Sequence, residues 1–269
     1  MLSREAEAAV FQAVTESPQS SLTANLPFVL HTLRSHRLLA ASGPAYSRWI
    51  QKLNRWLGLA NTVTSSAPRP SSELRDDVAP LEDLSSTPWI LLGATIRDAP
   101  HTTVLSEMGV WVKGVLRVMK IVVGSDVPET MSAPSSEHSL PGTDPRLAHI
   151  ATVCAEVLAS LVERALLWPD TRRSLLTDHL PRLLPVFLSL LSSSHTSSGS
   201  DAVSHLQERF AALAAILRVL QSSAKPFAPA VLQACLMWLE TSDELTQSLV
   251  TDCISALARC LGDHAVFFM

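Results

Sequence analysis

The sequence contains few of the residues that phosphate-binding and catalytic loops use. It has nine glycines in 269 residues, which leaves little material for a loop that cradles phosphate groups through its backbone. A P-loop, a Rossmann glycine fingerprint, a nucleophile elbow and an HExxH pattern are all absent. We therefore expect a chain that is not an enzyme and that needs no cofactor or metal.

Aromatic residues, cysteines and long apolar runs are also scarce. Aromatics make up 5% of the chain, with a single tyrosine, a composition that disfavours sheets. The cysteines all lie in apolar helical stretches and are expected to be reduced: Cys154, Cys235, Cys253 and Cys260. No apolar run approaches the roughly 18 residues of a membrane span, and the start lacks the layout of a signal peptide. We expect a soluble protein of the cytosol or nucleus, without membrane contact.

Positive charge is scattered rather than clustered. The chain has 21 basic and 25 acidic residues, for a net charge of −4, and its basic residues stand singly or in pairs such as Arg172-Arg173. Binding through phosphate neutralisation needs a clustered positive face. Any contact with RNA is therefore expected to be indirect, through partner proteins.

Apolar residues at helical spacing are what the sequence does contain, and residues 144–191 hold the longest such segment. Steps of three and four residues are the period of one helix face. The first half of this segment, the first arm of the helical hairpin described below, is predicted to be a helix that turns these residues inward: Leu147, Ile150, Val153, Cys154, Val157, Leu158, Leu161, Val162 and Leu166. The second arm is predicted to do the same with Leu175, Leu176, Leu180, Leu183, Leu184, Phe187, Leu188 and Leu191.

Turn residues divide this segment into a helical hairpin. Asp144-Pro145 starts the first helix, Trp168-Pro169-Asp170 ends it and starts the next, and Pro181 is predicted to divide the second arm. Neither arm can bury its stripe alone, and similar helices recur at about 40 to 50 residues, the spacing of two-helix repeats. The sequence thus predicts an all-α chain, an α-solenoid of degenerate armadillo/HEAT-like hairpins in a single domain over residues 1–269.

Polar segments interrupt the predicted helices. Three segments are predicted to be flexible insertions: residues 61–86, 124–143 and 192–200. All three are rich in serine, and the first two are also rich in proline. A shorter polar break is predicted at residues 18–21. The end at Met269 lacks the polar cap expected of a closed repeat stack, which suggests a fragment of a longer protein.

The cysteines, histidines and loop carboxylates are expected to have no catalytic or metal-binding role. Cys253 and Cys260 share a helix face with His264, but roughly 10 Å separates two helix positions seven residues apart, too far for one zinc ion. The histidines of the helical segments lack a neighbouring nucleophile and are expected to be structural: His31, His36, His149 and His179. Carboxylates of the first insertion are expected to be solvated: Asp76, Asp77, Glu82 and Asp83.

One helix supplies the candidate interface residues. Tryptophans on apolar stripes are expected to lie in the core: Trp49, Trp89, Trp111, Trp168 and Trp238. Trp56 lies nearest the basic face of its helix, close to Arg48, Lys52 and Arg55. An aromatic residue beside basic ones is typical of a protein interface, so these four residues are a candidate surface for an acidic partner, with solvated charges as the open alternative.

Several segments together resemble a known family. In order, LPFVLHTLRSHRLL, YSRWIQKLNRWL, WILLGATI, WVKGVLRVM and KPFAPAVLQACLMWL are similar to the N-terminal helical repeat domain of the Rix family of pre-rRNA-processing proteins, which includes the proline-, glutamate- and leucine-rich protein. The likeness spans about Leu26 to Leu239, and its motifs are helix-packing patterns.

The resemblance implies a scaffold subunit of a nuclear complex for assembly of the large (60S) ribosomal subunit and processing of the second internal transcribed spacer. The partners that this resemblance implies are other subunits of the Rix-type complex, a midasin-type AAA ATPase, pre-60S particles and a second copy of the chain. A generic armadillo/HEAT-like adaptor of another cytosolic or nuclear assembly would share every pattern above and stays open. A helical enzyme would require a polar cluster in a pocket.

Overall fold

The computed structural model describes residues 4–35, 44–59, 85–123, 145–193, 200–240 and 243–262. Within these ranges every regular element is a helix, which confirms the predicted all-α class. The chain divides into two compact units, Met1–Asp98 and Ala99–Met269. The predicted single domain over 1–269 stays a prediction. Most of the three predicted insertions lies outside the described residues.

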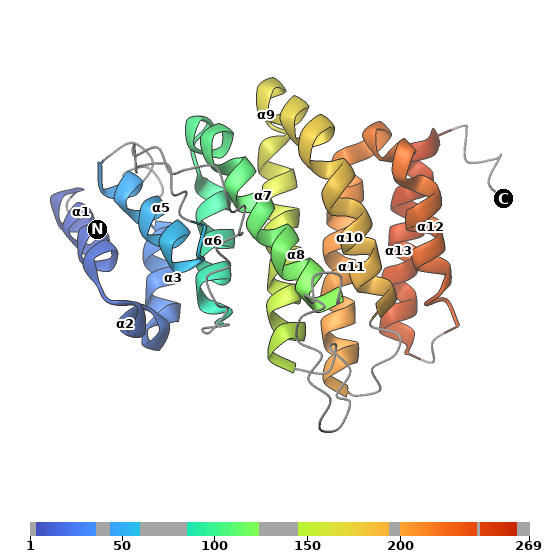
Figure 1. Cartoon of the computed structure of the whole chain (residues 1–269), viewed down its shortest axis with the longest axis horizontal. Coiled ribbons are helices and arrows are strands. Elements are labelled where there is room, and N and C mark those ends of the chain that lie inside the picture. Colours follow the sequence, from blue (N-terminus) through green and yellow to red (C-terminus); the bar gives the residue numbers. More distant parts are fainter. Residues whose placement is uncertain are drawn as a thin grey trace, which may run out of the picture. The chain divides into compact units, whose positions relative to one another are not determined.

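The first unit contains five described helices: α1 (Arg4–Glu16), α2 (Gln19–Ala24), α3 (Leu26–Ser35), α5 (Pro44–Trp56) and α6 (Thr87–Asp98) (Figure 1). α1 packs on α3 and α5, and α6 packs on the same two helices. Trp49 of α5 is fully buried, with its ring edge-on to Phe11 at 6.5 Å between centroids. Its Nε1 donates a hydrogen bond of 3.1 Å to the Thr95 hydroxyl, so one tryptophan joins three helices.

The polar break predicted at residues 18–21 is shorter in the structure, where only Ser17 and Pro18 separate α1 from α2. Pro18 has an extended backbone and directly precedes α2. Proline lacks the backbone N–H and is well tolerated where a helix starts, since the first N–H groups have no intrahelical partner. The polar residues after it therefore form a helical turn rather than a loop.

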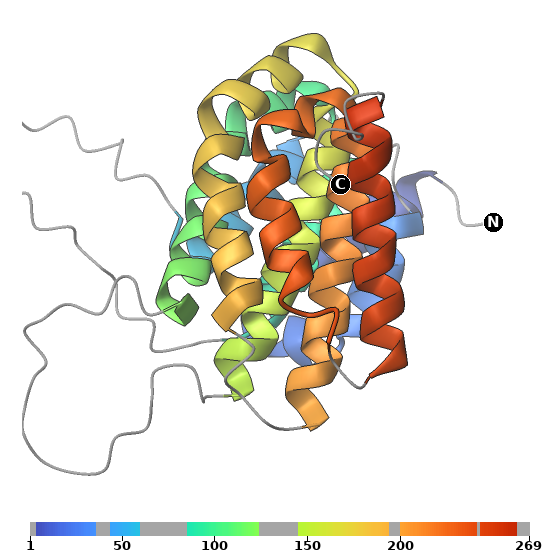
Figure 2. The same ribbon diagram turned by 90° about the vertical axis from the view of Figure 1, so that its right-hand side faces the viewer.

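The second unit contains longer helices: α7 (His101–Val123), α8 (Pro145–Ala165), α9 (Pro169–Ser174), α10 (Leu180–Ser193), α11 (Ser200–Leu220), α12 (Ala228–Leu236) and α13 (Glu244–Leu261). They form two rows. α10 contacts α7 and α12 in one row, and α11 contacts α8 and α13 in the other. Each helix of one row also packs on the next helix in sequence, which belongs to the other row. Figure 2 looks along the two rows, with the helices upright.

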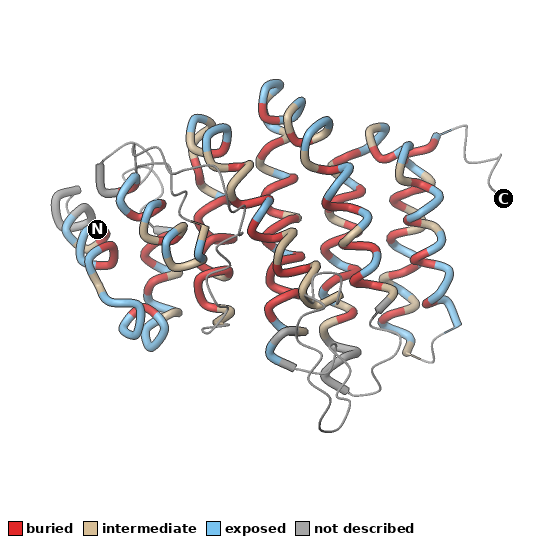
Figure 3. The backbone as a smooth tube through the Cα atoms, in the orientation of Figure 1, coloured by how far each residue is buried: buried red, intermediate tan, exposed pale blue. Residues whose placement is uncertain are grey.

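Burial in the second unit follows the predicted stripes. The apolar faces of α8 and α10 are buried between the rows, including Leu158, Leu161 and Phe187 with no exposed surface, and buried positions recur along each helix in Figure 3. At roughly 25 cal/mol per Å² of buried apolar surface, such faces supply the main favourable term of folding. The four cysteines are buried free thiols, as expected.

The interruption predicted at Pro181 lies just before that residue. Leu175–His179 forms a π-helical turn, in which the Leu180 N–H donates to the Leu175 carbonyl, and α10 starts at Leu180. Proline cannot donate and its ring crowds the preceding turn, so the wider turn lets the helical path continue. α10 extends through Ser193 and α11 begins at Ser200, so the ends of the predicted third insertion are helical.

Candidate protein-interaction sites

The basic face predicted on α5 is only partly on the surface. Arg48 and Arg55 are exposed, while Lys52 and Trp56 are half-buried. Positions 48, 52 and 55 lie on one side of the helix because they are spaced by four and three residues. The structure therefore brings the four predicted residues onto neighbouring turns, with two arginines pointing to solvent.

Lys52 has a structural contact that its sequence position did not reveal. Its Nζ donates to the Thr15 carbonyl at 2.7 Å and also to the Ser17 carbonyl. Thr15 lies in the last turn of α1 and Ser17 directly follows it, where backbone acceptors lack an intrahelical donor. Burial lowers the pKa of Lys52 from its ordinary value. The ammonium thus joins α5 to the end of α1.

Four of the five tryptophans assigned to the core are buried: Trp49, Trp89, Trp111 and Trp238. Trp238 also donates from Nε1 to the Leu191 carbonyl at 3.2 Å. Trp168 is half-buried instead, at the turn between α8 and α9. Its ring contacts two polar side chains, Arg164 and His101, that the sequence pattern did not connect with it.

That turn is held by side-chain contacts on both sides of Trp168. The Arg164 guanidinium lies 4.6 Å from the centre of the indole ring and donates from Nε and Nη2 to the Ala99 carbonyl, at 3.0 and 2.7 Å. The His101 ring lies against the indole, tilted by 46°, with 4.9 Å between the ring centres. The buried Thr171 hydroxyl donates to the Ala165 carbonyl at 2.6 Å and contacts the Trp168 carbonyl at 3.1 Å. The turn is therefore fixed by cation–π, ring and hydrogen-bond contacts.

An apolar groove with basic residues at its edge lies beside this turn. It measures about 370 Å³ and is lined by Leu166, Leu167, Pro169, Arg172, Arg173 and Leu176. We call it the α8–α9 groove. Leu167 is 60% exposed, and both arginines are exposed. Leu166 and Leu176 were predicted to face inward, but both are only half-buried.

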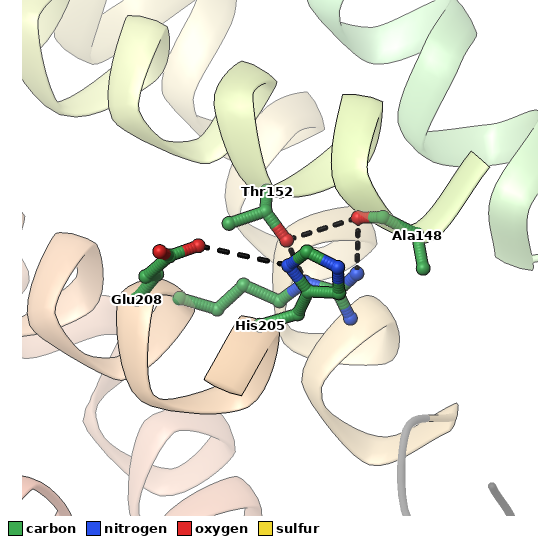
Figure 4. Close-up of polar contacts among 5 residues, drawn as sticks. Ala148, Thr152, His205 and Glu208 are labelled. Carbon is green, nitrogen blue, oxygen red and sulfur yellow. Dashed lines mark hydrogen bonds and ion pairs between the residues drawn. The ribbon is translucent and has the colours of Figure 1, made fainter. Parts of the chain in front are cut away.

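A buried arginine joins α8 to α11 (Figure 4). Arg209 is 4% exposed, and its guanidinium donates from Nε to the Thr152 hydroxyl at 3.1 Å and from Nη2 to the Ala148 carbonyl at 2.9 Å. Burial lowers the pKa of Arg209 to about 10, and the nearby Glu208 opposes this shift. The guanidinium remains charged at neutral pH, and its hydrogen bonds offset part of the cost of burying that charge.

Two histidines flank this bridge. The ring of His205 lies 5.6 Å from the ring of His149, centre to centre, and its Nδ1 is 3.6 Å from a carboxylate oxygen of Glu208. No sequence pattern predicted this group, because its members come from two helices more than fifty residues apart.

A second cleft lies at the C-terminal ends of α11 and α13. It measures about 480 Å³ and is lined by Arg218, Gln221, Ser222, Ala256, Arg259 and Cys260. Arg218 and Arg259 lie in the last turns of their helices, where a cation interacts favourably with the partial negative charge of the helix end. Arg218 also pairs with Asp252 at 3.7 Å. We assign these arginines a structural role.

The remaining reactive side chains form no common site in the described part of the chain. No group of three or more potential metal ligands occurs among those residues. His179 lies against Gly109, and burial is the main cause of its lowered pKa. His36, His264 and the acidic residues of the first insertion lie outside the described residues. No described helix is long and apolar enough to cross a membrane.

Comparison with known proteins yields no match among family models, curated proteins or solved structures.

Proposed function

We propose that this chain is a non-catalytic scaffold whose stacked helical hairpins form an armadillo/HEAT-like α-solenoid and whose outer surface binds other proteins. The observation that carries the proposal is the pair of helix rows in the second unit. Three successive helix pairs, α7 with α8, α10 with α11 and α12 with α13, each pack on the next pair. Stacked pairs of this kind bury a continuous core and leave an extended surface for partners.

The polar chemistry of the described residues supports a scaffold. The most buried cation, Arg209, donates to a hydroxyl and a backbone carbonyl that belong to the packing of two helices. Arg164 and Lys52 likewise donate to backbone carbonyls between helices. These groups hold helices together, and none of them lines either of the two clefts described above.

The cellular setting we propose is the nucleus, in assembly of the 60S subunit and processing of the second internal transcribed spacer. What supports this setting is the resemblance of the helical segments to the Rix family. The partners are then other subunits of a Rix-type complex, a midasin-type ATPase and pre-60S particles, with RNA contacted through them. Exposed Arg48 and Arg55, beside Trp56, are candidate contacts for an acidic surface.

Affinity purification of the full chain, followed by quantitative mass spectrometry, tests this proposal. We expect large-subunit precursor proteins and the midasin-type ATPase to be enriched over an unrelated helical bait. Nuclease treatment should leave the closest subunits bound, since RNA contact is indirect in this proposal. Enrichment of a different assembly would replace the ribosomal setting with the general adaptor, and a bait without specific partners would refute the scaffold itself.

A further inference from the structure

The α8–α9 groove differs from an ordinary scatter of surface leucines. Single exposed apolar side chains are common on soluble proteins. Here Leu167 stands in a groove whose other apolar walls are Leu166, Pro169 and Leu176. The apolar stripes of α8 and of the following arm therefore extend past the buried core onto the surface.

The rim of the groove carries positive charge. Arg172 and Arg173 both line it and are exposed, whereas Asp170 is the one acidic residue in the first turn of α9. Two guanidinium groups against one carboxylate leave an excess of positive charge at the edge of an apolar surface. Apolar centres with arginine at the edge are typical of protein interfaces, and arginine binds carboxylates in a bidentate manner.

The groove is also preorganised. Trp168, the residue between Leu167 and Pro169, is fixed by Arg164 and His101, and the Thr171 hydroxyl joins the end of α8 to the start of α9. A partner that binds a rigid surface loses less conformational entropy than one that must order a loop. The contacts that hold this turn thus favour binding although they do not line the groove.

We infer that the α8–α9 groove binds a short acidic segment of a partner protein, with one apolar side chain of that segment against Leu167 and its carboxylates paired with Arg172 and Arg173. The volume of about 370 Å³ suits a few side chains rather than a folded domain. Charge complementarity selects an acidic occupant. The inference rests on the proposed scaffold function and adds the chemistry of one partner.

A display library of short unstructured protein segments, panned against the full chain, gives the probe. Enriched segments should combine an apolar residue with flanking Asp or Glu. A fluorescein-labelled peptide of the most enriched segment is then titrated by fluorescence polarisation. Leu167→Asp should weaken binding about tenfold or more, the loss typical of a central interface residue. The double variant Arg172→Glu, Arg173→Glu should weaken it too, and added salt should weaken wild-type binding.

A matched control separates the groove from a general effect of losing an exposed leucine. Leu245 is 55% exposed on α13 of the same unit, so Leu245→Asp makes the same change elsewhere and should leave binding unchanged. Circular dichroism of all variants checks that they fold. Equal binding by wild type and Leu167→Asp, enrichment of basic segments, or no enrichment would each overturn the inference.

Affinity capture with the same variants distinguishes failure of the groove from failure of the scaffold. Loss of a specific acidic partner from Leu167→Asp, with retention by Leu245→Asp, supports the groove. If wild type and Leu167→Asp capture the same partners equally, the groove inference falls while the scaffold proposal stands. If neither protein captures a specific partner, both fall.

Discussion

Lys52, a candidate partner contact, donates to the carbonyls of Thr15 and Ser17 at the end of α1, and this contact has a measurable consequence. Lys52→Met removes the ammonium and keeps an unbranched apolar stem against the helix. A hydrogen bond from a charged donor contributes roughly 1.5 to 3 kcal/mol. Because the side chain of Lys52 is only half-buried, solvent screens both bonds, and we expect a total cost of about 1 to 2 kcal/mol.

Hydrogen exchange measured by mass spectrometry is the suitable assay, because it reports on the first unit without requiring that the whole chain unfold in one step. Amides of α1 should exchange roughly 5 to 30 times faster in Lys52→Met, the factor that corresponds to this free energy. Arg55→Met serves as the control, since Arg55 is exposed on the same helix. It should change α1 exchange little.

If the amides of α1 exchange as slowly in Lys52→Met as in Arg55→Met and the wild type, the reasoning is refuted. The ammonium would then contribute nothing to the junction of α1 with α5, and Lys52 would again be a candidate contact residue beside Arg48 and Arg55. Increased exchange in Lys52→Met alone assigns Lys52 to the fold and restricts the candidate interface on α5 to Arg48, Arg55 and Trp56.

Three further predictions concern the second unit. Thr152→Val removes the acceptor of Arg209 Nε without changing side-chain size and should cost about 1 to 3 kcal/mol in urea unfolding, whereas Thr152→Ser should cost much less. Gly109→Ala should stabilise α7 by about 0.5 to 1 kcal/mol in thermal unfolding, because the nearest atom to a new Cβ is His179 Cε1 at 3.8 Å. The pKa of Asp243 is lowered first by the hydrogen bond from the Thr246 side chain, then by Gln207. The stabilisation from this carboxylate is therefore present above the unfolded pKa of about 3.8 and lost as pH falls through the lower folded pKa, so Asp243→Asn should flatten the acid limb of the stability profile.

The helices were predictable because each apolar stripe is a local property. A spacing of three and four residues identifies the face that must be buried, whatever covers it, and nearly all described members of the α8 stripe are buried. Pro169 also starts α9 as its position in the sequence predicted, at the first helical position. Asp243 caps α13 through a hydrogen bond from the Thr246 N–H at 2.8 Å.

The candidate sites were harder to predict because they depend on contacts between distant residues. Nothing near Lys52 in the sequence indicates the carbonyls of α1, thirty-five or more positions earlier. Arg209 similarly finds Thr152 and Ala148 across 57 and 61 positions. A basic residue on an amphipathic helix has the same pattern whether it contacts solvent, a partner or a backbone carbonyl.

Leu166 and Leu176 show where periodicity alone fails. Both continue an inward stripe by one step, and periodicity therefore assigned them to the core. Each lies close to the α8–α9 turn, at the end of its stripe. The same spacing that buries Leu158 and Leu161 thus leaves two leucines half-exposed beside Arg172 and Arg173. An apolar stripe longer than the core that it meets ends on the surface among the described residues, where a partner can cover it. The leucines that the sequence assigned wrongly, Leu166 and Leu176, are therefore walls of the groove in which exposed Leu167 carries the inference of a bound partner.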